Sequence, residues 1–237
     1  MISAEGEHLK EDASNYNKAV YENPAVTVDI AIYCIQGAHL KVLLIQRKHP
    51  PFRDCWAIPG GFVNIKENET LEETARRELF EETNLKGVYL EQLKTYGDPS
   101  RDPRMRIITV AYFALMPGNF LQNNLIRAKD DATKAEWFSL RDLPPLAFDH
   151  KNILEDLLIR LIGKISYTPI AFSLLPEKFT WNRLREVYEI ILGKELVPAN
   201  FRRKISSMYK LKILRAKKKD GRGRPSTYIR YIGLKDF

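Results

Sequence analysis

The chain has 237 residues, of which 44% are hydrophobic and 11% aromatic, so it can bury a sizeable core and is long enough for two compact units. It holds nothing close to the run of about 18 apolar residues that a membrane-spanning helix needs, which excludes a helical membrane protein. Residues 1–159 carry 19 Lys and Arg against 24 Asp and Glu, whereas residues 160–237 carry 19 against 6, so only the second part predicts a polyanionic partner.

The first twenty-four residues are predicted to be an N-terminal extension. They are polar and acidic and lack the hydrophobic core of a signal peptide, so we expect a cytoplasmic protein. Residues 25–35 and 40–47 are rich in β-branched side chains and predict two strands joined by a short turn. The two cysteines, Cys34 and Cys55, lack metal-ligand spacing and are expected to be ordinary buried thiols of a reducing compartment.

The next elements alternate between helix and strand. A helix is predicted from about residue 69 to 84, and a second helix follows Asp149, its expected N-cap, from 150 to 164 with apolar residues at helical spacing. The remaining runs have the composition of strands. They are residues 87–97, 106–116 and 135–140.

The first helix divides its charged side chains between two faces. At about 100° per residue, Glu78 and Glu82 share the stripe that should face the core, with Glu81 on its flank. Carboxylates four residues apart repel, and burying them unpaired is costly. A divalent cation removes this cost, because oxygen ligands suit Mg²⁺ or Mn²⁺; a frayed acidic helix end is the alternative. The outer face is predicted to carry the pairs Glu72–Arg76 and Glu73–Arg77.

These residues resemble the Nudix box, Gly-x5-Glu-x7-Arg-Glu-U-x-Glu-Glu-x-Gly-U, in which U is bulky and apolar. The stretch RELFEE matches this pattern completely. Its spacing makes Glu69 the leading glutamate and lengthens the loop after Gly61 by two residues; the alternative assigns that role to Glu67. Asn84 stands at the position of the last glycine and can adopt the left-handed conformation at modest cost.

The resemblance implies a fold and a chemistry. The fold is a Nudix α/β/α sandwich with a mixed sheet over residues 25–163, including a connecting helix near 150–163. The chemistry is metal-dependent hydrolysis of a nucleoside diphosphate linked to another group. The residues implied for metal binding and catalysis are Glu78, Glu81 and Glu82. The residues implied to support the box are Gly60, Gly61, Glu69 and Arg77.

The rest of this half resembles the ADP-ribose-type Nudix proteins. The stretches that carry the likeness are LLIQRKHPPFRDCWAIPGGFV, SRDPRMRIITVAYFAL and AEWFSLRDLPPLAFDHKNIL. The resemblance implies that Arg47, Arg101 and Arg104 bind an anionic substrate, although a solvated turn around Pro103 also accounts for the last two. Glu136 is a candidate further acid or base, with a plain strand residue as the alternative.

The basic second part contains two helix signals followed by a hairpin signal. Thr180 is the expected N-cap of a helix that ends at Gly193. PANFRRKISSMYKL is predicted to bury Phe201, Ile205 and Met208 and to turn its basic residues outward, and two strand-like runs follow around a basic turn. This order is that of a winged helix-turn-helix, expected over residues 164–237. The candidate DNA contacts are Arg202, Arg203, Lys204, Ser206, Lys217, Lys218, Arg222 and Arg224.

The turn of the hairpin has a resemblance of its own. Gly221-Arg222-Gly223-Arg224-Pro225 resembles the core of the AT-hook, which lies in a narrow A/T minor groove. Narrow minor grooves concentrate negative potential and attract arginine. An ordinary glycine-rich turn is the alternative.

The order of the two parts resembles the NrtR family, the Nudix-related transcription regulators. This implies an α+β Nudix domain followed by a winged helix-turn-helix, in a homodimer that binds double-stranded DNA at a palindromic operator and senses ADP-ribose or a related nucleotide. One alternative is a Nudix hydrolase of the ADP-ribose pyrophosphatase type without a regulatory role. Another is a regulator of sugar utilisation that senses a sugar or sugar phosphate.

Overall fold

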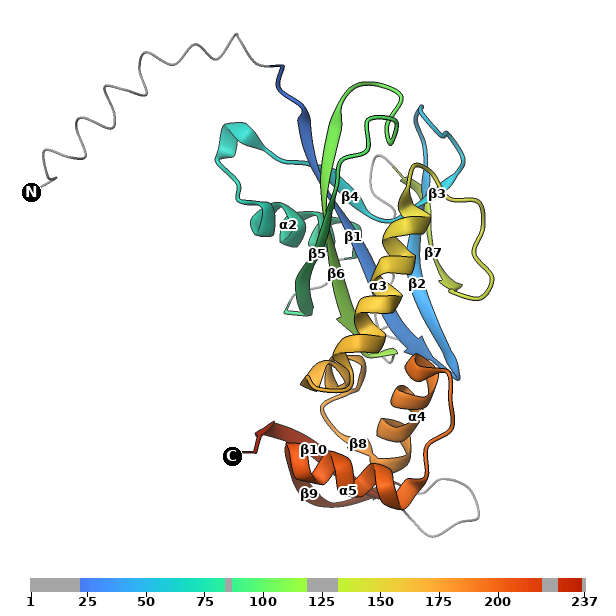
Figure 1. Ribbon diagram of the computed structural model, residues 1–237, viewed down its shortest axis with the longest axis vertical. Helices are drawn as coiled ribbons and strands as arrows, with labels where there is room; N and C mark the ends of the chain where they lie inside the picture. The colour runs from blue at the N-terminus through green and yellow to red at the C-terminus, as the bar shows by residue number, and fades with distance from the viewer. Residues whose placement is uncertain (1–21, 84–86, 119–131, 219–225, 236–237) are drawn as a thin grey trace, which may run out of the picture.

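The computed structural model describes residues 22–83, 87–118, 132–218 and 226–235, so most of the predicted extension lies outside it. In Figure 1 a mixed sheet fills the upper part of the molecule, and a smaller sheet with two helices lies below it. Among the described residues, no helix is both long and apolar enough to cross a membrane.

The larger sheet is built around β1 (Ala25–Gln36). This strand pairs in parallel with β6 (Ile107–Met116) and antiparallel with β2 (His39–Arg47), so the sheet is mixed as predicted. Over the described residues the strand order is β3-β2-β1-β6-β5, with β4 on β1 and β7 on β2. The other strands are β3 (Trp56–Ala57), β4 (Gly60–Phe62), β5 (Tyr89–Tyr96) and β7 (Ala132–Ser139).

Successive residues of β1 are buried on opposite faces of the sheet, as the two-residue period of a strand requires. Ile30 and Ile32 pack in the cluster that contains Leu71, Ala75 and Leu79 of α2 (Leu71–Thr83). Tyr33 packs in the other cluster, with α3 (His150–Lys164). A helix therefore covers each face, which confirms the α/β/α sandwich.

The smaller unit is a winged helix. Its sheet has the order β8-β10-β9, from β8 (Phe179–Thr180), β9 (Tyr209–Lys218) and β10 (Ser226–Leu234). Thr180 caps α4 as predicted, because its side chain accepts a hydrogen bond from the N–H of Arg183, and Gly193 ends the helix at φ 64°. The other elements are η2 (Ile65–Glu67), η4 (Pro169–Leu174), α4 (Trp181–Leu192) and α5 (Pro198–Met208). α5 buries Phe201 and Ile205 as predicted, whereas Met208 is only partly buried.

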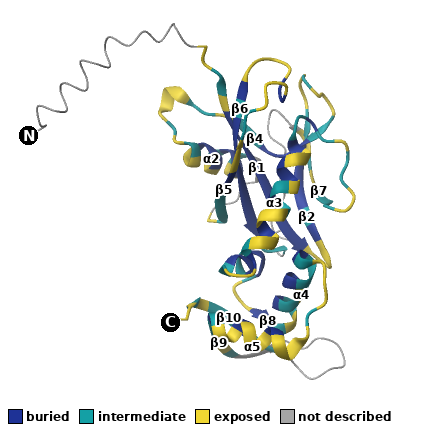
Figure 2. Ribbon diagram, in the orientation of Figure 1, coloured by how far each residue is buried: buried dark blue, intermediate teal, exposed yellow. Residues whose placement is uncertain are grey.

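The two units share one hydrophobic core. Leu157 and Leu161 of α3 are fully buried in a cluster that also contains residues of the large sheet and of α4, α5 and β10. Figure 2 shows buried residues in the strands of the large sheet and again in α4, while the visible side of α3 is mostly exposed or intermediate. Arg183 of α4 adds polar contacts, donating to the carbonyls of Ile35 (3.4 Å) and Gly37 (3.2 Å) at the end of β1. The winged helix is therefore packed on the sandwich.

Candidate functional site

The start of α2 is fixed by side chains that pair with its free backbone groups. Thr70 Oγ1 accepts a hydrogen bond from the N–H of Glu73 (3.2 Å), and the Glu73 carboxylate accepts one from the N–H of Thr70 (2.8 Å). This reciprocal capping box starts the helix two residues later than predicted. It also occupies Glu73, so the predicted pair of Glu73 with Arg77 is wrong. The predicted pair of Glu72 with Arg76 is confirmed, at 2.6 Å.

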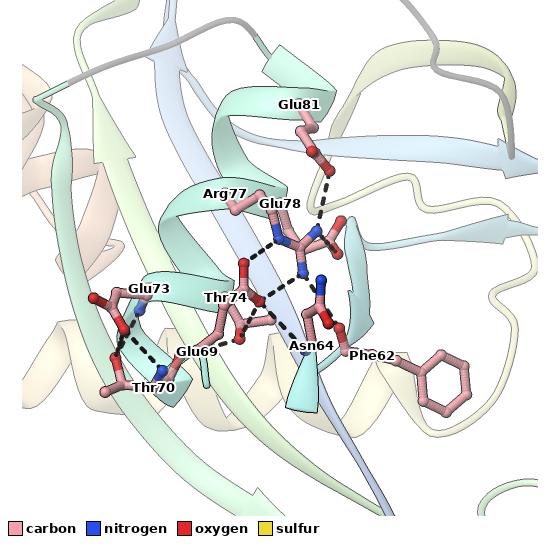
Figure 3. A network of polar contacts seen from close by, with 9 residues as sticks. All are labelled: Phe62, Asn64, Glu69, Thr70, Glu73, Thr74, Arg77, Glu78 and Glu81. Atoms are coloured by element: carbon pink, nitrogen blue, oxygen red, sulfur yellow. Dashed lines mark hydrogen bonds and ion pairs between the residues drawn. The ribbon is translucent and has the colours of Figure 1, made fainter. Parts of the chain in front are cut away.

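Arg77 instead gathers the acidic residues of the box (Figure 3). Its Nε lies 2.7 Å from Glu69 Oε1, and its Nη1 lies 2.6 Å from Glu78 and 3.1 Å from Glu81. These contacts give Glu69, and not the exposed Glu67, the place of the leading glutamate. The Arg77 hydrogen bonds hold the pKa of Glu69 at about 2, below its ordinary 4.5. The arginine therefore fixes the ends of the inserted loop to the helix that carries the glutamates.

Two consecutive glycines bring β4 against carboxylates. A Cβ at Gly60 would lie 2.5 Å from Asp29 Oδ1, and one at Gly61 would lie 2.1 Å from Glu78 Oε1. Both distances are shorter than any real side-chain contact, so only glycine leaves these two carboxylates room. Asp29 and Glu78 both contribute to one surface.

That surface is part of a cavity of about 480 Å³. It is lined by residues of β1, β4, α2, the 101–107 segment and the start of α3. Among the predicted site residues, those that line it are Arg47, Gly60, Gly61, Arg77, Glu78, Glu81, Arg101 and Arg104.

Arg101 holds the frame of the cavity. Its side chain is only 4% exposed, and its guanidinium donates to both oxygens of Asp149 (2.7 and 3.0 Å) and to Asp29 Oδ2 (3.2 Å). Burying an arginine is tolerable here because two carboxylates pair with it. The pairing also explains why Asp149, although it occupies the predicted N-cap position of α3, makes no capping hydrogen bond with its side chain.

Arg104 is fixed differently and leaves one side open. The buried Asp102 accepts hydrogen bonds from Arg104 Nε (3.0 Å) and Arg104 Nη2 (2.8 Å). The Arg104 side chain stays 42% exposed. Its guanidinium carbon lies 5.8 Å from the ring of Phe62 and 6.0 Å from that of Phe148. The Arg47 guanidinium lies 4.9 Å from the Phe148 ring. The cavity thus has two cations beside the exposed ring of Phe62 and the half-buried ring of Phe148.

Phe148 adopts a backbone conformation that is costly for a bulky residue. Its φ is 53°, and its ring contacts those of Phe52, itself at φ 59°, and His150. Positive φ at an aromatic residue persists only where the surroundings impose it, and such residues gather at ligand sites. Sequence patterns do not reveal backbone strain, so this signal was missed.

His150 and Asp29 were also missed. Both side chains line the cavity and are nearly buried. The N–H of Ile58 donates to His150 Nδ1 (3.0 Å), and burial lowers the pKa of the imidazole. A single carboxylate in an otherwise apolar strand is the sequence signal that would have found Asp29, because such a group is costly unless partnered.

The cavity does not gather every predicted residue. Glu136 is exposed on β7 and is not among the residues that line the cavity, a placement that favours the plain strand residue. Glu82 belongs to α2, but its side chain lies outside what the structure describes, as does Asn84. Of the predicted thiols, Cys34 is buried and Cys55 half-buried, and burial raises the pKa of Cys34 to about 12.

The acidic residues of α2 suit a hard divalent cation by their chemistry. Glu78 and Glu81 both line the cavity, and Gly61 leaves the Glu78 carboxylate open to it. Among the described side chains, which do not include that of Glu82, no three acidic, histidine or cysteine groups are close enough to form a metal site.

The winged helix presents a basic face. Four of the predicted DNA contacts, Arg202, Arg203, Lys204 and Ser206, are exposed on α5, whereas Phe201 and Ile205 of the same helix are buried. The Arg202 guanidinium lies 5.7 Å from the Trp181 ring. The backbones of Lys217 and Lys218 lie in β9 opposite β10, while Arg222 and Arg224 fall outside the described residues.

A mixed-sheet sandwich with a Nudix box and an attached winged helix defines the class of this protein. The family model of the NUDIX domain matches residues 24–157, and that of the NrtR DNA-binding winged helix domain matches residues 171–231. The chain therefore belongs to the NrtR family of Nudix-related transcription regulators. The match also relates it to the Nudix hydrolases, which generally use divalent metals.

Individual relatives agree with this placement. The "ADPR responsive transcriptional repressor NtrR" of Acinetobacter baylyi is 39% identical over 194 residues, 81% of this chain and 76% of the relative. The "ADP-ribose pyrophosphatase" of Methanocaldococcus jannaschii is 42% identical over 147 residues, 62% of this chain and 79% of the relative.

The solved structure of Shewanella oneidensis NrtR with a 27mer DNA is similar at a TM-score of 0.77 and 35% identity, covering 87% of this chain and 93% of that one. The NUDIX domain of the same protein, solved with ADP ribose, is similar at a TM-score of 0.55 and 36% identity, covering 64% of this chain and 97% of that one.

Proposed function

We propose that this protein is a cytoplasmic transcriptional regulator whose DNA affinity is set by ADP-ribose or a related nucleoside diphosphate in the Nudix cavity. The observation that carries the proposal is the path of α3. Asp149 and His150 at its start line or frame the cavity, and Leu157 and Leu161 belong to the core shared with the winged helix. A ligand that moves the first turn of α3 therefore acts on the helix against which the DNA-binding unit is packed.

The cavity has groups suited to each part of ADP-ribose. Arg47 and Arg104 supply positive charge for the diphosphate, and the exposed ring of Phe62 and the half-buried ring of Phe148 suit a base. We assign Glu78, Glu81 and Glu82 to one or more Mg²⁺ or Mn²⁺ ions. When bound, such an ion would neutralise the diphosphate and activate a water. The ADPR-responsive repressor and the ADP-ribose complex among the relatives support this ligand.

For the DNA unit we propose that the exposed face of α5 enters the major groove, with Arg202, Arg203, Lys204 and Ser206 in contact with the operator. The β9–β10 hairpin, with Lys217, Lys218, Arg222 and Arg224, acts as the wing. A homodimer would place two such units on a palindromic operator. The 27mer DNA complex of the Shewanella oneidensis relative supports this proposal.

Hydrolysis of ADP-ribose to AMP and ribose 5-phosphate is a second candidate function, because the acidic residues of the box are retained and one relative is an ADP-ribose pyrophosphatase. Glu82→Gln should lower the rate by on the order of 10²-fold or more. Release of AMP with Mg²⁺ or Mn²⁺ is the measurement. If the unchanged protein does not hydrolyse ADP-ribose or related dinucleotides, the enzyme function is excluded and only the sensor function remains.

The regulatory proposal is tested by thermodynamic linkage. ADP-ribose should change the operator Kd by about 5–150-fold, and the operator must change the ADP-ribose Kd by the same factor. Both constants are measured in the Glu82→Gln variant, to stop turnover, once it is shown to bind ADP-ribose. An operator Kd that is identical with and without saturating ADP-ribose would exclude it as the effector; a shift by a sugar phosphate instead would favour the regulator of sugar utilisation.

A further inference from the structure

Asp29 and His150 lie side by side in the cavity without bonding to each other. His150 Nε2 is 3.8 Å from Asp29 Oδ1, which is too long for a hydrogen bond. The other oxygen of Asp29 accepts from Arg101, and the Asp29 and His150 side chains are only 12% and 4% exposed. Among the described residues, neither Nε2 nor Oδ1 has a hydrogen-bond partner. Two polar atoms from nearly buried side chains are thus available in one cavity.

The backbone fixes which of the two atoms donates. The N–H of Ile58 points at His150 Nδ1, so this nitrogen accepts and carries no proton. Burial lowers the pKa of His150, which keeps the ring neutral near neutral pH. The single ring proton is then on Nε2, next to an Asp29 oxygen that can only accept.

The pair stays open because Gly60 stands in front of it. A side chain there would collide with Asp29 Oδ1, at 2.5 Å from its Cβ. The next residue, Gly61, leaves room for the Glu78 carboxylate in the same way. Asp29, His150, Glu78 and Glu81 all line one cavity, so the Asp29–His150 pair shares that cavity with the acidic residues assigned to the metal.

A donor beside an acceptor selects the chemistry of the group that binds there. A phosphate oxygen only accepts, and its charge would face the Asp29 carboxylate. A hydroxyl both donates and accepts, so it can give its proton to Oδ1 and receive one from Nε2. We propose that Asp29 and His150 recognise a ribose hydroxyl next to the diphosphate of the ligand. The assignment rests on the proposed nucleoside diphosphate ligand and names the pair that distinguishes its sugar.

The test compares ADP-ribose with its 2′-deoxy, 3′-deoxy and 2″-deoxy analogues by calorimetry, on the full chain with Glu82→Gln. At least one analogue should bind about 5–150-fold more weakly, because it leaves the buried pair unsatisfied. Adding His150→Phe, or separately Asp29→Asn, should bring that ratio close to one. The measured quantity is the Kd of the analogue divided by the Kd of ADP-ribose. A general loss of structure would weaken the binding of all four ligands together and would leave this ratio unchanged.

Asp156→Asn is the matched control. Asp156 also lies on α3 and pairs with Tyr96 and Lys94, away from the cavity, so this variant should keep the ratio of the parent chain. Four ligands of equal affinity in the parent chain, or a ratio that survives both cavity variants, would overturn the assignment. Failure of ADP-ribose itself to bind would instead overturn the proposed function.

If both cavity variants fail to fold, the unchanged side chain answers the question by NMR. ADP-ribose should shift the Nε2–H resonance of His150, and the weakly bound analogue, at saturation, should not. An Nε2–H resonance that is the same with every ligand would overturn the assignment.

Discussion

The first turn of α3 and its later turns are held by opposite kinds of interaction. At the first turn, Asp149 is bound by the buried Arg101, which also binds Asp29. Farther along, Leu157 and Leu161 are packed among apolar side chains of both units. The polar end depends on a few directed contacts between charges, whereas the apolar end depends on many undirected ones.

The two kinds of interaction suit two different tasks, recognition of the ligand at the start of α3 and transmission of its effect to the winged helix farther along. Directed polar contacts distinguish one ligand from another, because each contact is lost when one of its two partners is removed. A close-packed apolar interface does not deform gradually. A shift of α3 would therefore move the elements packed on it as one rigid unit. Under the proposed function, one helix with a polar start and an apolar remainder would convert occupancy of the cavity into a new position of the winged helix.

The largest expected effect comes from breaking the polar end. Arg101→Leu leaves Asp29 and Asp149 buried without their cation, and it should lower the free energy of unfolding by roughly 3–5 kcal/mol. Urea denaturation measures the change. Arg76→Leu, which removes a pair exposed on the surface of α2, should stay within about 0.5 kcal/mol. If the two variants lost similar free energies of unfolding, the buried pairs of Arg101 would stabilise the fold no more than a surface pair does.

Breaking the apolar end should have a slightly smaller effect that is shared by both units. Leu157→Ala removes a fully buried side chain and should lower the free energy of unfolding by about 2–5 kcal/mol. Because the core is common, calorimetry should show one transition moving as a whole. Ile159→Ala, on the exposed side of the same helix, is the control and should be nearly neutral. Two transitions, of which only one moves, would contradict a shared core.

A smaller effect should follow a change in the cavity wall that leaves the ion pairs of Arg101 and the apolar contacts of α3 in place. Phe148→Leu removes the ring beside Arg47 and Arg104 and should weaken ADP-ribose binding by about 5–150-fold, as expected when a stacked base loses its partner. Binding of ribose 5-phosphate, which has no base, should hardly change. Phe80→Leu, on α2 and outside the cavity lining, is the matched control. Equal losses for both ligands would remove Phe148 as a base platform.

The smallest effect concerns the acidic network in acid. The folded pKa of Glu69 is about 2 and its ordinary value is 4.5, so its stabilising contribution is present above pH 4.5 and is lost as the pH falls toward 2. The stability difference between the unchanged protein and Glu69→Gln should therefore be constant above about pH 5 and narrow below it. Urea titrations over that range measure it, with Glu72→Gln as the surface control. A difference that does not change with pH would exclude the Arg77 pair as its source.

The sequence by itself determined the features that depend on neighbours along the chain. Thr180 and Gly193 mark the ends of α4 because capping acts within a few residues, and the spacing of the apolar residues in α5 gave its buried face. The Nudix box and the basic hairpin are local patterns of the same kind. They sufficed for the order of the two units and for the helix that carries the acidic residues.

Only the tertiary structure decided which charges meet. Arg101 binds Asp149 and Asp29 across 48 and 72 residues of sequence, and Ile58 fixes His150 across 92. Local energetics alone favour Asp149 as a cap, but a buried guanidinium must be paired, and that requirement outweighs a capping bond of about 1 kcal/mol. Pairing across the fold, which no local pattern encodes, therefore built the cavity around the residues that the sequence had supplied.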